Sequence, residues 1–398
     1  MSNRPDIDLL AGSFWGGDHL SAFAWMREND PVYRDEKSGV WAITRYRDLK
    51  DVEKDPATFS NGGGIRPDSG PLPMMIDMDA PDHVQRRRLV SSGFTPRHIR
   101  ELEGHVTATC DRLIDDVIEG GECEFVGDVA AWLPLILIGE MMGMDESMRH
   151  DLLVWSDDLV KGQGSTDPAL IEGATVAFIA WDGFIRGVIE DRRSSGSRQD
   201  LVGILAHAEV DDMKLTDDEI VYESLLILIG GDETSRHVIT GGLEALLHNP
   251  DAMLALRRDP SAMPLAVEEM LRWVSPLKNM ARTVTRDVEF GGKTLREGEK
   301  LILCFPSANR DAAQFAEPDR FDITRSPNDH VAFGFGPHFC LGNQLARMEL
   351  RCMFTRLIER MDDIALASDA PLLRRPANFV SGIEAMPITF TPGTKLGN

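Results

Sequence analysis

The sequence offers little that would indicate a membrane span, a disulfide framework or a nucleic-acid partner. Its longest apolar runs, such as residues 225–231, are far too short to span a bilayer. Its five cysteines, at positions 110, 123, 304, 340 and 352, form no C-x-x-C pair, so neither disulfides nor a zinc site is indicated. The 65 acidic residues outnumber the 42 basic residues, and the formal charge of −23 argues against binding of nucleic acid.

The N-terminus shows no sign of a targeting signal, and the rest of the chain shows no sign of a boundary between domains. Residues 1–12 contain no basic n-region and no long apolar h-region, as a secretory signal would. No Pro/Gly/Ser-rich linker, low-complexity run or internal repeat is present. We therefore expect a single domain, residues 1–398, in a soluble, cytoplasmic protein without a transmembrane anchor.

Several common catalytic motifs are also missing. The sequence has no H-E-x-x-H, no G-x-S-x-G and no dinucleotide-binding G-x-G-x-x-G. Gly291-Gly292-Lys293-Thr294 resembles the end of a phosphate-binding loop, but Asp287 stands where that motif requires its first glycine. Because no nicotinamide or flavin site is visible, electrons for redox chemistry would have to come from a partner.

What the sequence does contain is mostly helical periodicity. Thr216 and Glu219 form a capping box, and no strong stop follows until Asn249–Pro250, which predicts a helix of about 33 residues and about 50 Å. Other helical patterns cover residues 20–29, 45–54, most of 82–206, 251–258, 264–273 and the stretch after Cys340 up to about residue 360. Short strand patterns occupy residues 32–34, 40–43, 280–284, 288–290 and 301–305, and residues 379–390 suggest a hairpin. The fold class is therefore mainly α with small β-sheets.

The stretch FGFGPHFCLG, residues 333–342, is the strongest motif. Its glycines and proline exclude a regular element, and Cys340 directly precedes a helical pattern, where free N–H groups and the helix dipole favour a thiolate. A rigidly held thiolate surrounded by phenylalanines suits an iron ligand, and Gly342 allows close approach of a large flat group. A single buried cysteine is usually a small hydrophobic residue, but the pattern F-x-x-G-x-x-x-C-x-G is complete here.

The predicted long helix carries a second motif, Gly230-Gly231-Asp232-Glu233-Thr234. Each glycine inside a helix costs about 1 kcal/mol relative to alanine, and close approach of a flat ligand or of another helix would explain that cost. The Thr234 hydroxyl can donate to the carbonyl of Gly230, four residues earlier, which bends or opens a helix. An opened turn beside an acid and a hydroxyl would accommodate water and bound oxygen.

These motifs resemble those of the cytochrome P450 superfamily, and the resemblance covers essentially the whole chain in order. Phe333, Gly336, Cys340 and Gly342 match the haem-ligand loop of that family. The resemblance implies a triangular, mostly helical haem domain. It also implies heme b (iron protoporphyrin IX) as cofactor, with the Cys340 thiolate as axial ligand to the iron.

The resemblance extends to other site residues. Gly231, Glu233 and Thr234 match the oxygen-activation motif, which implies that Thr234 hydrogen-bonds bound oxygen and that Glu233 helps to relay protons. The family's contacts to the haem propionates imply four further cofactor-binding residues: His83, Arg87, Arg282 and His338. A structural Glu–Arg–Arg network is implied for three more: Glu269, Arg272 and Arg320.

Several stretches look closer to one branch, the actinobacterial P450s that oxidise the side chain of cholesterol and cholest-4-en-3-one: 60–67, 73–83, 226–234, 270–282 and 376–387. That similarity implies hydroxylation, and further oxidation to the acid, of a terminal methyl (C26/C27) of a sterol. The reaction would use O2 and electrons from a ferredoxin and an NAD(P)H-dependent ferredoxin reductase. The residues expected to line the substrate pocket are mostly apolar: Ile65, Met74, Ile76, Leu226, Ile229, Gly230, Val274, Met280, Phe379 and Val380.

Some alternatives stay open at this point. The same apolar lining would suit branched or long-chain fatty lipids, and the methionines of residues 60–81 could form a lid or simply pack on the core. A non-catalytic haem sensor or a peroxide-using enzyme would not need the Glu233–Thr234 pair. Arg86, Arg88, Arg347 and Arg351 could form a basic docking face for an acidic ferredoxin, or could be scattered solubilising charges.

Overall fold

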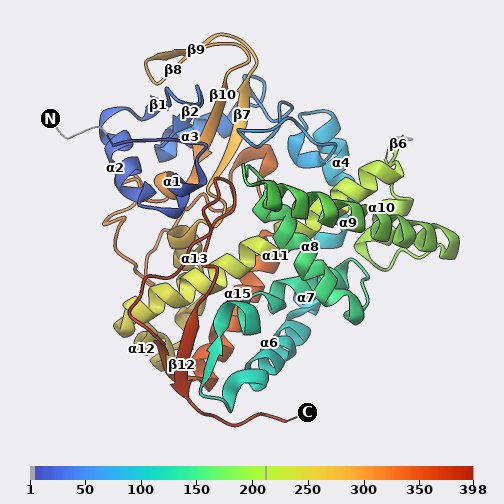
Figure 1. Ribbon diagram of the computed structural model, residues 1–398, viewed down its shortest axis with the longest axis vertical. Helices are drawn as coiled ribbons and strands as arrows, with labels where there is room; N and C mark the ends of the chain where they lie inside the picture. The colour runs from blue at the N-terminus through green and yellow to red at the C-terminus, as the bar shows by residue number, and fades with distance from the viewer. Residues whose placement is uncertain (1–4, 211–212, 398) are drawn as a thin grey trace.

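The computed structural model describes residues 5–210 and 213–397, and helices make up most of it. Most of them gather on one side, while the short helices of the N-terminal segment lie with a small sheet on the other (Figure 1). The helices are α1 (Gly12–Gly16), α2 (His19–Asn29), α3 (Tyr46–Lys54), α4 (Asp82–Ser91), α5 (Pro96–Glu101), α6 (Glu103–Ile118), α7 (Trp132–Met141), α8 (Arg149–Gly162), α9 (Pro168–Ser195), α10 (Leu201–His207), α11 (Asp217–His248), α12 (Pro250–Arg258), α13 (Met263–Val274), α14 (Phe305–Ala308) and α15 (Asn343–Arg360).

The strands form small sheets rather than a central one. The largest has five strands in the order β1-β2-β10-β7-β3, in which β10 runs parallel to β2 and the other neighbours are antiparallel. A second sheet has the order β11-β12-β4. The strands are β1 (Val32–Arg34), β2 (Trp41–Ile43), β3 (Phe59–Ser60), β4 (Glu122–Glu124), β5 (Glu209–Val210), β6 (Met213–Lys214), β7 (Asn279–Val284), β8 (Val288–Phe290), β9 (Lys293–Leu295), β10 (Lys300–Cys304), β11 (Asp362–Leu366) and β12 (Pro387–Thr391).

Helix α11 is the axis of the helical part. Its predicted start is confirmed: the Thr216 hydroxyl accepts from the N–H of Glu219, whose carboxylate accepts from the N–H of Thr216. The helix crosses the middle of the molecule, in contact with α7, α9, α13 and α15 (Figure 1). Since most of its residues are buried on several sides, packing fixes the position of its Gly230–Thr234 turn.

The predicted hairpin over residues 379–390 is wrong. The strand β12 pairs with β11 and β4 instead, and the preceding residues make only single bridges, between Val380 and Leu277 and between Ile383 and Arg374. A reason lies at Gly382, where an added Cβ would come within 2.2 Å of the buried ring of His237. The chain is held against α11 here and cannot fold back on itself.

Helix α9 is long and apolar enough, by length and composition, to cross a membrane, and only 17% of its most apolar stretch is buried. One helix of this kind is weak evidence for a span. Trp181, Ile185 and Ile189 on its inner face are buried, and the helix contacts α8, α10 and α11. These contacts join it to the helical core.

Candidate functional site

The loop that carries Cys340 is shaped by its glycines. Gly334 and Gly336 have φ values of 69° and 73°, which only glycine adopts without strain, and a Cβ on Gly336 would come within 2.5 Å of the carbonyl of Glu53. The N–H of Cys340 donates to the carbonyl of Phe333 at 2.9 Å, which closes the loop. The sulfur is thereby placed just before the N-terminus of α15.

The environment of the Cys340 sulfur contains opposing influences. Burial raises the pKa of the thiol, while the backbone N–H groups of Gly342 and Asn343 and the guanidinium of Arg87 favour the thiolate. The helix terminus therefore does not by itself ionise the cysteine, contrary to the expectation from sequence. A metal cation on the sulfur would supply the missing stabilisation, because coordination deprotonates a thiol.

Cations gather close to this loop. Arg282 is buried, lies 3.6 Å from a carboxylate oxygen of Glu53, and has its pKa lowered by burial. His83 of α4 stacks on His338 with ring centroids 3.9 Å apart. Arg87 donates to the carbonyl of Phe339 at 2.5 Å, and burial lowers its pKa as well. All four residues predicted to meet the haem propionates thus lie near the Cys340 loop.

The space and charge around these residues suit a haem. A Cβ added to Gly342, or to Gly230 on α11, would meet no atom within 4 Å, so open space lies beside both glycines. Burial disfavours the charges of Arg87 and Arg282, and two propionates would offset that cost. The thiol, the two open glycines and the buried cations fit haem b.

The turn on α11 has the local geometry expected from sequence. The Thr234 hydroxyl donates to the carbonyl of Gly230 at 2.8 Å, as predicted. Gly231 permits helix packing, since a Cβ there would come within 2.8 Å of the side chain of Ile138 on α7. The two glycines therefore serve different purposes: Gly231 admits a neighbouring helix, and Gly230 faces open space.

Glu233 lies beside Thr234 in sequence but faces a buried charged cluster, which we call the Glu233 network: Asp157, Asp232, Glu233, Arg236, His237 and Arg375. Glu233 is fully buried, pairs with Arg236, and accepts from Arg375 at 2.8 Å. Burial alone would raise the pKa of Glu233, but the two guanidinium groups outweigh it and hold the pKa well below its usual range. Among the described residues no hydrogen bond joins Glu233 to Thr234, so a proton-relay role for Glu233 stays a prediction.

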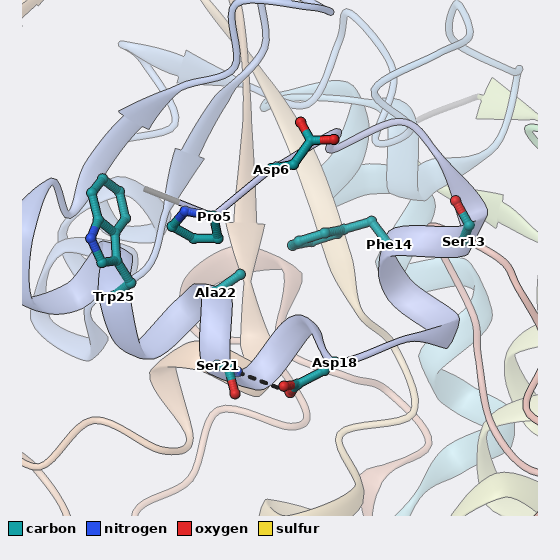
Figure 2. Close-up of a pocket in the computed structure, with 8 residues that line it drawn as sticks. All are labelled: Pro5, Asp6, Ser13, Phe14, Asp18, Ser21, Ala22 and Trp25. Carbon is teal, nitrogen blue, oxygen red and sulfur yellow. Dashed lines mark hydrogen bonds between the residues drawn. The ribbon is translucent and has the colours of Figure 1, made fainter. Parts of the chain in front are cut away.

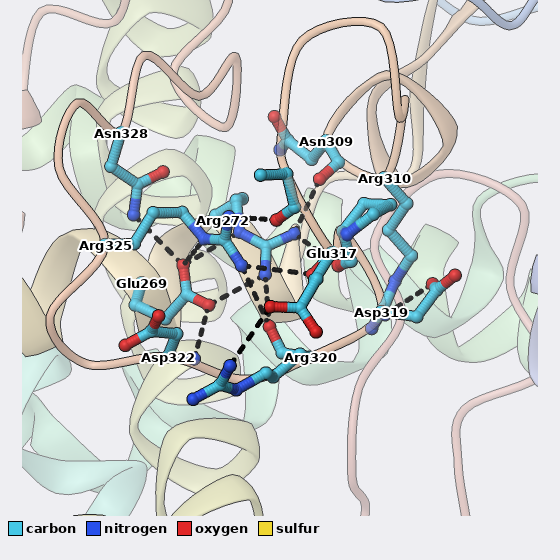
Figure 3. A network of polar contacts seen from close by, with 12 residues as sticks. Glu269, Arg272, Asn309, Arg310, Glu317, Asp319, Arg320, Asp322, Arg325 and Asn328 are labelled. Carbon is cyan, nitrogen blue, oxygen red and sulfur yellow. Dashed lines mark hydrogen bonds and ion pairs between the residues drawn. The ribbon is translucent and has the colours of Figure 1, made fainter.

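A second buried cluster, the Glu269 network, joins α13 to the segment that precedes the Cys340 loop (Figure 3). Arg272 donates two hydrogen bonds of 2.8 Å to the Glu269 carboxylate and others to the carbonyls of Asn309, Pro318 and Arg320. Arg325 also donates to Glu269, at 3.1 Å. The network binds the loop segments to the helical core.

The prediction that the Arg320 side chain completes this network is wrong. Its guanidinium is exposed and pairs with Glu317, and only its backbone carbonyl accepts from Arg272 and Arg325. Arg325 occupies the expected place, five residues later. The spacing in sequence could not distinguish the two arginines, because the chain between them is irregular.

The predicted pocket residues divide between two clusters. Six of them pack in one apolar cluster together with Val160 and Leu277: Ile65, Ile76, Ile229, Met280, Phe379 and Val380. Leu226 and Val274 pack against the main core instead, with Val274 beside Gly241, seven residues beyond Thr234 on α11. Met74 is buried, which favours packing over an exposed lid. Leu277, which was not among the predicted pocket residues, packs against this apolar cluster.

A groove of about 470 Å³ lies near the N-terminus, apart from the Cys340 loop (Figure 2). It is lined by Pro5, Asp6, Ser13, Phe14, Asp18, Ser21, Ala22 and Trp25. These side chains come only from the first segment of the chain, and Asp18 is occupied in capping α2 through the N–H of Ser21 (Figure 2). None of the predicted site residues lies in this groove.

A partly buried cysteine before a helix, cations suited to two carboxylates and open space on the side of α11 define a haem-thiolate protein. A family model described as Cytochrome P450 matches residues 174–362. Over its full length the chain is 51% identical to a steroid C26-monooxygenase of Mycobacterium tuberculosis, which it covers entirely. The protein belongs to the cytochrome P450 family of monooxygenases, whose cofactor is haem b with a cysteine thiolate ligand.

Other relatives extend the comparison. A steroid C26-monooxygenase of Mycolicibacterium smegmatis is 52% identical, with 98% of each chain covered. A vitamin D(3) 25-hydroxylase of Pseudonocardia autotrophica is 36% identical over 97% of this chain and 96% of its own. Among solved structures, CYP268A2 of Mycobacterium marinum in complex with pseudoionone has a TM-score of 0.89 at 31% identity, covering 98% of this chain and all of that one.

Proposed function

We propose that this protein, as a single haem domain of residues 1–398, hydroxylates the terminal methyl of a steroid side chain and oxidises it further. The observation that carries the proposal is the apolar cluster around Phe379 and Val380, which reaches Ile229, the neighbour of Gly230. It forms an apolar surface next to the turn that carries Thr234. The similarity to two steroid C26-monooxygenases over nearly the whole chain supports a steroid as substrate.

The residues contribute to the reaction in separate ways. Cys340 would hold the iron, and Arg87, Arg282, His83 and His338 would hold the propionates. The bound haem supplies O2 activation and transfer of one oxygen atom to a C–H bond. The apolar cluster would bind the substrate through desolvation and exclude water.

Thr234 would handle protons at the oxygen site. Its hydroxyl donates to the Gly230 carbonyl, so it would have to rotate away from that carbonyl to donate a hydrogen bond into the site, and its oxygen can accept a hydrogen bond from water. Glu233 is held ionised by its arginines, so its carboxylate has no proton to donate until those pairs open and it takes one up. We propose that Glu233 relays protons only after such an opening.

Electrons would come from a ferredoxin and its NAD(P)H-dependent reductase, in a cytoplasmic setting. The docking face predicted from sequence needs one correction, since Arg86 is buried and pairs with Glu219 and Glu223. Arg88 is exposed, and so is Val84, one turn earlier on α4; Phe339 of the Cys340 loop is exposed as well. Arg347 and Arg351 pair with Glu268 and Glu103 and keep partial exposure. Changing Arg88 to Glu should slow reduction by an acidic ferredoxin and weaken its dependence on ionic strength, whereas unchanged rates would remove Arg88 from the face.

The proposal is tested by optical titration of the ferric protein with cholest-4-en-3-one and, in parallel, with a long-chain fatty acid. A saturating low-to-high-spin shift with the steroid, followed by a product oxidised at the terminal methyl, is the expected result. A shift with the fatty acid alone would replace the steroid by a fatty lipid. Binding without any product, given a competent ferredoxin and reductase, would favour a haem sensor.

A further inference from the structure

Arg66 stands out among the cations because it is partly buried and poorly paired. It follows Ile65 of the apolar cluster, and its guanidinium lies 5.3 Å from the centre of the Phe379 ring of the same cluster. Burial lowers its pKa. Its only hydrogen bond within the described residues joins Nε to the Gln163 amide oxygen at 3.3 Å, which leaves the N–H groups on both Nη atoms without a protein acceptor.

The carboxylates near Arg66 are already engaged. Asp77 uses both oxygens to accept from the N–H groups of Ile65 and Leu72, at 2.8 Å each. Asp68 accepts from the side-chain amide of Asn378 at 2.9 Å. The two aspartates raise the pKa of Arg66 through space and so offset its charge. They do not accept hydrogen bonds from its guanidinium.

The backbone around Arg66 is braced, which fixes the point from which its side chain extends, and Gln163 orients the guanidinium. Lys300 of β10 donates to the carbonyls of Arg66 and Ser69, at 2.9 and 2.7 Å. Gln163 is the C-cap residue of α8, and Phe379 belongs to the segment held against α11. Arg66 therefore lies where the 60–81 loop, the end of α8 and the C-terminal segment meet.

A ligand oxygen would satisfy these donors. The apolar cluster extends from Phe379, beside Arg66, to Ile229, beside the turn that carries Thr234. A substrate whose methyl lies at Thr234 and whose apolar body lies along the cluster would bring its other end to Arg66. Two aspartates and two cations, Arg66 and Lys300, balance in charge at this end, which favours a neutral oxygen over a carboxylate.

We propose that Arg66, oriented by Gln163, binds a neutral carbonyl or hydroxyl oxygen at the end of the substrate remote from the oxidised methyl. For the steroid of the proposed function, on which this inference rests, that oxygen is the substituent on the first ring. Arg66 thereby selects ring-oxygenated steroids over the bare hydrocarbon and fixes how far the side chain reaches towards Thr234.

The test compares cholest-4-en-3-one with its 3-deoxy analogue, cholest-4-ene, by spin-state titration of the haem-loaded protein. The wild type should bind the ketone roughly tenfold more tightly, as expected for one hydrogen bond from a charged donor. Arg66→Met, which keeps an apolar stem, should bind both steroids equally, and Arg66→Lys should keep part of the preference. Arg47→Met is the matched control, because the Arg47 side chain is 91% exposed.

Each outcome has a defined meaning. A wild type without preference, or an Arg66→Met variant that keeps the full preference, overturns the inference while the steroid reaction stands. A different outcome is that neither steroid causes a spin shift, whereas a fatty acid binds to the wild type and binds weakly to Arg66→Met. This result would show that Arg66 binds a carboxylate, and it would overturn the proposed function as well. Should Arg66→Met fail to take up haem, the preference of Arg66→Lys and of Gln163→Leu decides the matter, since both should be reduced.

Discussion

The two buried charged networks differ in how completely their polar atoms are paired. In the Glu269 network both carboxylate oxygens accept from arginines, and Arg272 also donates to three backbone carbonyls. In the Glu233 network an oxygen of Asp232, the Nε of Arg236 and both ring nitrogens of His237 have no hydrogen-bond partner among the described residues. Only one such atom, the side-chain oxygen of Asn328, occurs at the edge of the first network.

This difference indicates that the Glu269 network has a structural role, whereas the Glu233 network can change its hydrogen bonds or its protonation. A satisfied buried network has one favourable arrangement, because every alternative breaks a charge-assisted bond. An incompletely satisfied network can rearrange or exchange protons at lower cost, and burial raises the pKa of Asp232 to about 7 within it. The Glu233 network, which is incompletely paired and which we call the flexible network, lies beside Thr234, where protons are needed. The Glu269 network, which is fully paired at its centre and which we call the rigid network, lies beside the loop that holds Cys340.

The largest expected effect comes from removing the negative charge of Glu269 from the Glu269 network. Glu269→Gln keeps the shape of the side chain but leaves the fully buried Arg272 without its counter-charge, which should cost about 3–5 kcal/mol of folding free energy. We expect little or no haem-loaded protein, measured by the reduced CO spectrum and by thermal unfolding. Glu317→Gln, in an exposed pair, should change stability by less than about 0.5 kcal/mol, and an equal loss in both variants would contradict the distinction.

The Glu233 network should make the folding free energy depend on pH. Burial raises the pKa of Asp232 to about 7, so its neutral form is favoured, and its stabilising contribution is complete below pH 3.8 and lost as pH rises through 7. Burial lowers the pKa of His237 to about 4, so its contribution is complete above pH 6.5 and lost as pH falls through 4. The two contributions have opposite signs over nearly the same window.

Single variants should therefore expose opposite slopes. Relative to wild type, Asp232→Asn should gain folding free energy as pH rises from 4 to 7, and His237→Gln should gain it as pH falls from 6.5 to 4. Each change should reach up to about 3 kcal/mol, at about 1.4 kcal/mol per pH unit. Urea unfolding at a series of pH values measures both, and parallel curves for the two variants would mean that neither group titrates within the folded protein.

A smaller effect distinguishes the two arginines of the segment after α13. Arg325 is nearly buried and donates to Glu269 and to three backbone carbonyls, so Arg325→Met should cost about 2 kcal/mol. Arg320→Met should cost less than about 0.5 kcal/mol, since the backbone carbonyl of residue 320 is unchanged and its side chain is exposed. Chemical denaturation of both variants decides which arginine belongs to the network.

That pair also shows where reading the sequence reaches its limit. The capping box at Thr216 and the Thr234 to Gly230 hydrogen bond could be predicted, because both depend on residues a few positions apart. The second arginine partner of Glu269, Arg325, could not, since it depends on the path of an irregular segment more than fifty residues further along the chain. The same holds for Arg375, which reaches Glu233 from the C-terminal segment. Local chemistry is visible in a sequence, whereas long-range pairing through loops requires coordinates.

The smallest expected effect comes from changing Thr234. This residue belongs to neither network, and it lies next to the Glu233 network. Thr234→Val preserves the branched shape and removes only the hydroxyl, so fold, haem uptake and substrate affinity should be unchanged. Product formed per electron supplied should fall about tenfold, which is less than the usual effect of losing a positioned proton donor, because water can also carry protons to the site. Thr234→Ser restores the hydroxyl and should recover product to within about twofold of wild type. If Val and Ser variants convert electrons to product equally well, the proton must reach the site through water alone, and the link between the flexible network and the hydroxyl would be broken.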